Sequence, residues 1–89
     1  MNSIYIIFLN DEIKGYLSDK TTTIQRVVVL SEKLAEEERQ KYTTKVRIFT
    51  EQKDGYVNIY VQQLGRYIDG LVELKHTIKW KELTEYKTD

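Results

Sequence analysis

Two Asp-Gly pairs, Asp54-Gly55 and Asp69-Gly70, interrupt a stretch of alternating apolar and polar residues and constrain the fold more than any other feature. A type I′ turn of two residues needs positive φ at both positions, and Asp-Gly between alternating hydrophobic residues is a strong sequence signal for it. The two pairs therefore predict three consecutive antiparallel strands, over residues 43–52, 56–68 and 71–81.

The two turns also predict how these strands are aligned. The first turn places Lys53 opposite Tyr56, and the second places Ile68 opposite Leu71. Both registers gather aliphatic side chains on one face of the sheet, where the predicted pairs are Ile48 with Val61, Thr50 with Ile59, Val61 with Ile78, and Ile59 with Trp80. A slip of one residue would move a whole set to the other face, so the agreement between two turns supports the prediction.

The segment at residues 4–9 is apolar on both faces, since Ile4, Ile6 and Phe8 alternate with Tyr5, Ile7 and Leu9. Such a run is typical of a strand inside a sheet, so we expect it near the centre. Asn10-Asp11 then turns the chain into a second strand at 13–17. This hairpin pairs Phe8 with Ile13, Ile6 with Gly15 and Ile4 with Leu17, which places Ile4, Ile6 and Phe8 toward the core.

Residues 22–41 carry apolar side chains at helical spacing. The stripe consists of Ile24, Val27, Val28, Leu30, Leu34 and Ala35. The threonines at 21–23 offer N-caps, and Thr22 with Gln25 has the spacing of a capping box. The β-branched run at 27–29 leaves a second interpretation open, in which residues 23–30 form a strand and a shorter helix begins at Ser31.

These elements predict an α+β fold of two layers, an antiparallel sheet in the order ββαβββ along the chain with one amphipathic helix packed on one face. The 89 residues are enough for a single domain. It comprises an N-terminal hairpin at 3–17, the helix at 22–41, a three-stranded meander at 43–81 and a frayed tail at 82–89.

The composition excludes several function classes. Fourteen basic and fourteen acidic residues cancel, so no overall field attracts nucleic acid or an anionic membrane. The absence of cysteine removes thiol nucleophiles, disulfides and thiolate zinc sites, and makes the cytoplasm the expected location. The longest apolar run, 4–9, is far shorter than the roughly 20 residues of a membrane helix, so we expect no membrane association or export signal.

The single histidine, His76, does not indicate an enzyme. The predicted register places it on the packed side of the sheet beside Gln63, without a serine or cysteine partner, so we expect a structural hydrogen bond there. The chain lacks the ligand spacing of a metal site and a glycine-rich phosphate loop, so no cofactor is expected. The run Glu36-Glu37-Glu38 is interpreted as a solvated helix surface with local ion pairs.

The sheet face opposite the core carries the candidate binding residues. Aromatic and cationic side chains are interleaved on it, with Arg66 predicted to pair with Glu73 across the strands. The candidates are Tyr5, Tyr16, Arg47, Phe49, Tyr56, Tyr60, Arg66, Lys75 and Lys79. Tyrosine and arginine are enriched at protein interfaces, so we expect a protein partner, with homodimerisation as a further form of the same binding. The alternatives are single-stranded nucleic-acid binding by base stacking, and tyrosines that act only as strand formers.

The hairpin strand Ile13-Lys14-Gly15-Tyr16-Leu17, followed by a capped helix, resembles small accessory proteins of phages and mobile elements, including inhibitors of the anti-CRISPR type. Such proteins bind and block a larger host protein. The resemblance implies a role of that kind through surface contact, since the mixed charge of this chain differs from the strongly acidic inhibitors that imitate DNA.

Overall fold

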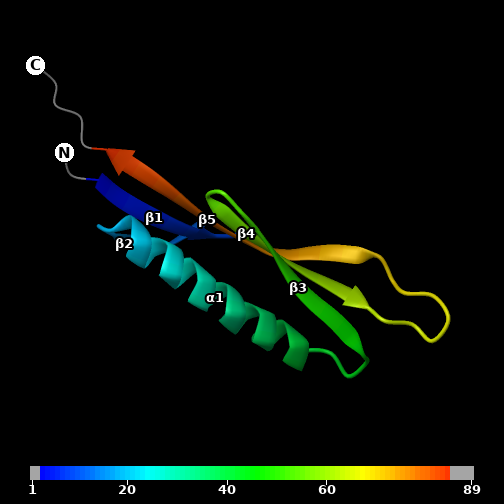
Figure 1. Cartoon of the computed structure of the whole chain (residues 1–89). Helices are drawn as coiled ribbons and strands as arrows, with labels where there is room; N and C mark the ends of the chain where they lie inside the picture. The colour runs from blue at the N-terminus through cyan, green and yellow to red at the C-terminus, as the bar shows by residue number, and fades with distance from the viewer. Residues whose placement is uncertain (1–2, 85–89) are drawn as a thin grey trace, which may run out of the picture.

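A computed structural model describes residues 3–84 and shows one antiparallel five-stranded sheet with one helix on it (Figure 1). The elements are β1 (Ser3–Leu9), β2 (Glu12–Leu17), α1 (Lys20–Gln40), β3 (Val46–Lys53), β4 (Tyr56–Gln63) and β5 (Val72–Thr84). The predicted α+β fold and its ββαβββ order are therefore confirmed. The strand that was expected to fray from residue 82 instead remains in β5 through Thr84, and residues 85–89 lie outside the described range.

The strands lie in the order β2-β1-β5-β4-β3, so β5 is central and β1 has a neighbour on each side. The domain is long and thin, with principal extents of 65 × 19 × 18 Å. Its radius of gyration, 16.4 Å, exceeds the roughly 12 Å of a compact chain of this length. In Figure 1 the beginning of β1 and the end of β5 lie at one tip, and the loop between β4 and β5 forms the opposite tip.

The β3–β4 hairpin has the predicted register throughout, from Lys53 opposite Tyr56 to Val46 opposite Gln63. Its turn is not type I′, because Gly55 has φ +85° while Asp54 is outside the left-handed region. The turn between β1 and β2 has left-handed values at both positions instead, with φ 50° at Asn10 and 71° at Asp11. Two-residue turns were therefore correctly placed at both sites, although the turn types differ.

The predicted turn at Asp69-Gly70 is wrong. β4 ends at Gln63 and β5 begins at Val72, so residues 64–71 form a loop. Its backbone bends back at Gly65, where a side chain would collide with the carbonyl group of Ile68. Hydrogen bonds pin both ends of this loop, from Gly70 N–H to the Gln63 carbonyl (2.8 Å) and from Leu64 N–H to the Lys45 carbonyl (3.0 Å).

The loop changes the register between β4 and β5. Ile59 lies opposite His76 rather than Trp80, a shift of four residues along β5 (80 − 76), and Val57 lies opposite Ile78. The even shift keeps Ile59 and Ile78 on the same face as predicted. A bulge beside Ile59 and Tyr60 then gives β5 one extra residue, Lys75, so that beyond it Tyr60 pairs with Leu74 and Gln62 with Val72.

The faces of β1 are also reversed relative to the prediction. Ile7 lies opposite Trp80 and Leu9 opposite Ile78, which places Tyr5, Ile7 and Leu9 on the side of the helix. In the β1–β2 hairpin the pair Phe8 with Ile13 is confirmed, but a bulge between Ile7 and Phe8 pairs Ile7, not Ile6, with Gly15 and Tyr5, not Ile4, with Leu17. Ile4, Ile6 and Phe8 therefore point away from the helix.

The helix is continuous from Lys20 to Gln40, so the interpretation of residues 23–30 as a strand is wrong. Its N-cap is Asp19 rather than a threonine. The Asp19 carboxylate accepts hydrogen bonds from the Thr22 N–H and from the Thr22 hydroxyl, both at 2.8 Å, and these bonds lower the pKa of Asp19. Asp19 is the N-cap in place of a threonine because its carboxylate accepts from two donors of the first turn, the N–H and the hydroxyl of Thr22.

One face of the helix covers the aliphatic side of the sheet. Val27 packs with Ile7, Val57, Ile59 and Ile78 in the buried cluster, and both Ile59 and Ile78 are fully buried. Thr23 and Ser31 also lie on this buried stripe. Their hydroxyls donate to the carbonyls of Asp19 and Val28, at 2.7 Å in each case, so their burial leaves no donor unpaired.

Candidate binding surfaces

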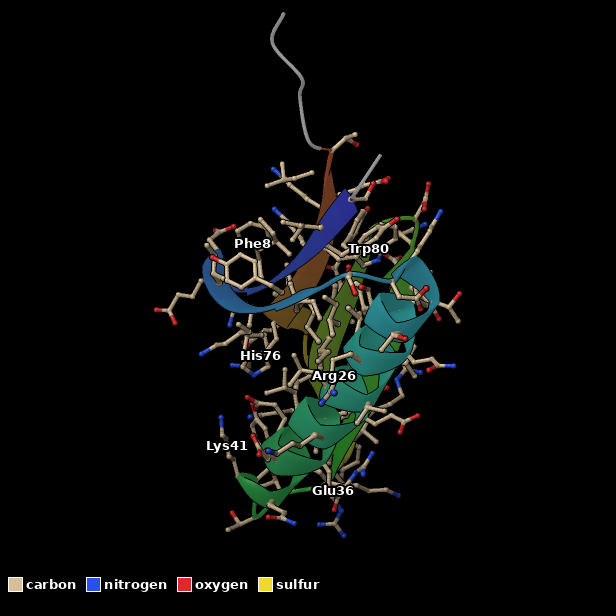
Figure 2. The ribbon with its side chains drawn as sticks, turned by 90° about the vertical axis from the view of Figure 1, so that its left-hand side faces the viewer. Phe8, Arg26, Glu36, Lys41, His76 and Trp80 are labelled. Atoms are coloured by element: carbon tan, nitrogen blue, oxygen red, sulfur yellow. The ribbon has the colours of Figure 1, made fainter. Side chains whose placement is uncertain are left out.

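The face of the sheet away from the helix, called the open face below, has no layer of the described chain over it (Figure 1). The strand pairings assign to it Arg47, Phe49, Glu51 and Lys53 of β3, Tyr56, Asn58, Tyr60 and Gln62 of β4, Val72, Leu74, Thr77, Lys79, Lys81 and Leu83 of β5, and Ile4, Ile6, Phe8, Ile13 and Tyr16 of the first hairpin. Figure 2 shows Phe8 and Trp80 on opposite sides of β1, in agreement with this division of the two faces.

Six of the nine candidate residues lie on the open face, although Tyr16 of edge strand β2 is at the far side of the sheet from Arg47 and Phe49 of β3. The six are Tyr16, Arg47, Phe49, Tyr56, Tyr60 and Lys79. The other three do not join them. Arg66 is in the 64–71 loop, so its predicted pair with Glu73 does not form, and Lys75 is the bulge residue of β5.

Tyr5 faces the helix and is only 7% exposed. Its ring lies 6.1 Å from that of Trp80, and its hydroxyl donates to the Glu82 carboxylate at 3.3 Å. Burial raises the pKa of the Tyr5 phenol, and the charge of Glu82 adds to that rise. Tyr5 was misplaced because both faces of β1 are apolar, so the alternation does not distinguish them.

Lys75 contacts Glu73, with 2.9 Å between ammonium and carboxylate, and lies near Tyr42 after the helix. The hydrogen bond to Glu73 raises the pKa of Lys75, as does the negative charge of that carboxylate. Lys75 is therefore paired with Glu73 on the helix side of the sheet and does not lie on the open face.

An ordered group of aromatic and polar side chains occupies the open face of β3 and β4. The rings of Phe49 and Tyr60 are stacked, 5.3 Å apart at 19°, and the Arg47 guanidinium lies 5.0 Å from the Phe49 ring. The Tyr60 hydroxyl donates to Glu51 (3.4 Å) and accepts from the Asn58 amide (3.2 Å). These contacts fix the rings in place, which reduces the side-chain entropy that the protein itself would lose when a partner binds.

The open face is basic although the whole chain is neutral. Its strands carry, among the described residues, the cations Arg47, Lys53, Lys79 and Lys81 and one acid, Glu51. The carboxylate of Asp11, in the β1–β2 turn, lies 3.8 Å from the Lys79 ammonium. The neutral total conceals this asymmetry, because seven of the acidic residues lie on the helix or on the packed side of the sheet.

The 64–71 loop exposes three large apolar side chains that were predicted to lie in the two strands on either side of a tight turn. Tyr67 is 90% exposed, Ile68 84% and Leu71 91%. Val72 and Leu74 continue this apolar surface onto the open face. The signal that could have located it is the pair of glycines, Gly65 and Gly70, since two flexible positions around an apolar segment are typical of a loop.

His76 lies on the packed side as predicted, but its partner is Glu38 rather than Gln63. His76 Nε2 is 2.9 Å from the Glu38 carboxylate, and the Asn10 amide nitrogen is 3.1 Å from His76 Nδ1. The Asn10 amide oxygen accepts from the Thr77 N–H (2.9 Å), so its nitrogen faces His76 as a donor. This arrangement assigns the proton of the neutral ring to Nε2, which donates to Glu38.

Glu38 was expected to be solvated and is instead only 4% exposed. Burial alone would raise the pKa of Glu38, but hydrogen bonds from Lys41 and His76 outweigh that effect and lower it. Figure 2 shows His76 and Lys41 on the same flank of the helix. These contacts include no nucleophile. The network connects the end of α1 to β5 and to the β1–β2 turn.

A cleft of about 540 Å³ runs between β2 and the helix. Its apolar lining comes from Ile7, Leu9, Leu17 and Leu30, and Lys14 and Arg26 also line it. Figure 2 shows Arg26 on the exposed surface of the helix. The volume falls within the range of about 300–1,000 Å³ that is common for ligand sites.

No helix within residues 3–84 is both long and apolar enough to cross a lipid bilayer. Over the same range, no group of three or more His, Cys, Asp or Glu side chains is arranged to hold a metal ion. No known protein family, curated protein or solved structure matches the chain.

Proposed function

We propose that this protein acts, without enzymatic activity, by binding another protein through the tip and the adjoining open face of its β4–β5 end. The observation that carries the proposal is the exposure of Tyr67, Ile68 and Leu71 on one loop. Large contiguous apolar surface is rare on a soluble monomer and marks interaction sites, because exposing it to water is costly.

The surroundings of the loop have the composition of a protein interface. Arg66 lies 6.0 Å from the Tyr67 ring, and the stacked group of Arg47, Phe49 and Tyr60 lies on the open face of the same end. Tyrosine and arginine dominate binding energy at interfaces, where a polar rim surrounds an apolar centre. The hydrogen bonds that pin residues 64 and 70 also limit the entropy lost on binding.

The form of action that we propose is obstruction of the partner, as in the phage inhibitors that the sequence resembles. A rod-shaped domain with an apolar tip reaches into a recess of a larger protein without needing chemistry of its own. A host protein of the cytoplasm is the partner that this resemblance supports.

Replacing Tyr67, Ile68 and Leu71 together by serine should abolish capture of partner proteins from a lysate of the source cells, as identified by mass spectrometry. The fold should persist, because these side chains are at least 84% exposed and contribute little to packing. The matched control is Val29→Ser on the helix, 61% exposed, which should capture the same proteins as the wild type. Equal capture by the triple variant, or no specific capture by the wild type, would contradict the proposal.

The basic open face favours single-stranded nucleic acid as the second candidate. If its four cations all contact phosphates, the affinity for a labelled oligonucleotide should fall about 50-fold between about 50 and 200 mM salt. The double variant Arg47→Glu/Lys79→Glu should then not bind, while the serine variant of the loop should still do so. Absence of binding at low salt would remove this candidate, because phosphate contacts are strongest there.

A further inference from the structure

The second open feature of the molecule is the edge at β2. This strand pairs with β1 on one side and, among the described residues, has no strand on its other side. The peptide groups along that edge are free to pair with an added strand. The cleft between β2 and α1 lies directly beside this edge.

The cleft exists because the helix does not cover the sheet completely. Leu17 is the β2 residue that packs against the buried cluster, and Gly15, opposite Ile7 on the side of the helix, has no side chain to fill the space. A Cβ atom placed on Gly15 would meet nothing within 4 Å. The apolar residues beneath are therefore left partly uncovered, at a position where a further strand would place its side chains.

Cationic groups stand on both walls of the cleft. Lys14 belongs to β2 and Arg26 to the helix. Arg26 forms no ion pair within residues 3–84, and the nearest carboxylate oxygen of Glu12 is 3.7 Å from Lys14, with both side chains exposed. An exposed pair at that distance contributes little, so both cations are available to an anionic ligand.

We propose that the β2 edge binds an extended peptide segment as a sixth strand, with two apolar side chains in the cleft and an acidic side chain between them. Side chains at every second position of an added strand point to one face, so three such positions would lie over the cleft. Main-chain hydrogen bonds to β2 supply affinity, and the apolar floor with Arg26 and Lys14 supplies selectivity for the pattern apolar, acidic, apolar. This site is separate from the 64–71 loop and does not depend on the function proposed above.

The probe is the heptapeptide Thr-Val-Thr-Glu-Thr-Val-Thr, blocked at both ends and fluorescently labelled, with a counterpart that has lysine in place of glutamate. At low salt the glutamate peptide should bind about ten-fold more tightly than the lysine peptide, since one charge-assisted contact accounts for a factor of that size. Amide NMR signals of Glu12–Leu17 should shift on binding. A version with proline at the central threonines should not bind, because it lacks the required N–H groups.

Arg26→Glu should reverse the preference between the two peptides. Lys33→Glu is the matched control, because it makes the same charge change two helical turns further along, outside the cleft. Gly15→Ile should fill the cleft and reduce binding about ten-fold while the fold is retained, since the added atoms enter open space.

Four results would overturn the proposal. Three are equal affinity for the two peptides, equal effects of Arg26→Glu and Lys33→Glu, and NMR shifts confined to the open face. The fourth is binding by a second copy of the chain, because a dimer that dissociates in Gly15→Ile would show that β2 pairs with itself. The serine variant of the 64–71 loop should bind the glutamate peptide as the wild type does, so failure of either proposal is recognised separately.

Discussion

Replacing Ile78 by alanine is expected to lower the free energy of unfolding by about 2–5 kcal/mol, the range found when a buried isoleucine is truncated. Ile78 is fully buried in central β5, between Leu9 of β1 and Val57 of β4. The lost methyl groups would leave a cavity beneath the helix that the neighbouring strands cannot close. Since a domain of this length has a total stability of about 4–13 kcal/mol, the variant would lose a large fraction of it.

Urea denaturation followed by circular dichroism measures this loss. Ile13→Ala is the control, because it makes the same substitution on the open face, where Ile13 is 52% exposed. Its effect should be below about 1 kcal/mol. Similar losses at Ile13 and Ile78 would contradict the assignment of the packed face.

Replacing Glu38 by glutamine is expected to cost about 1.5–3 kcal/mol near neutral pH, because the buried acceptor of Lys41 and His76 loses its charge. The pKa of Glu38 is lowered in the folded state from its ordinary value of 4.5. A carboxylate whose pKa is lower in the folded than in the unfolded state stabilises the fold fully at a pH above the unfolded-state pKa. This stabilisation is lost as the pH falls through the folded-state pKa. The stability difference between wild type and variant should therefore narrow in acid.

Urea denaturation of wild type and Glu38→Gln at a series of pH values from about 7 down to about 3 measures this difference in stability on both sides of the ordinary pKa of a glutamate. Glu37→Gln is the matched control, since Glu37 is the adjacent, exposed carboxylate. Its substitution should leave the pH dependence of the wild type unchanged. A constant difference between wild type and Glu38→Gln across this range would show that the charge of Glu38 does not stabilise the fold.

The parts of the fold that depend on neighbouring residues could be predicted from the sequence. The hairpin at Asp54-Gly55 places Arg47, Phe49 and Tyr60 together on the open face, and its register follows from one local turn. The helix likewise follows from its apolar stripe, despite the β-branched residues at 27–29, because packing against the sheet outweighs their small propensity cost.

The errors come from contacts between distant parts of the chain. At Asp69-Gly70 the local turn signal competes with the bend at Gly65 and the bulge at Lys75, neither of which alternation reveals. The orientation of β1 is set by its pairing with β5, because its own two faces are equally apolar. Burial of Glu38 depends on His76, which lies 38 residues away and was aligned with the wrong partner.

The central position of β5 has a consequence for how the chain becomes a folded protein during synthesis. The two hairpins that precede it, β1–β2 and β3–β4, do not touch each other in the sheet and are joined through residues 72–84. The pairing of Ser3 with Thr84 closes a loop of almost the whole described chain, and such distant pairings form slowly. Until β5 has emerged from the ribosome, each hairpin has a second unpaired edge and an apolar face exposed, which makes this interval the point at which chaperones would be needed most.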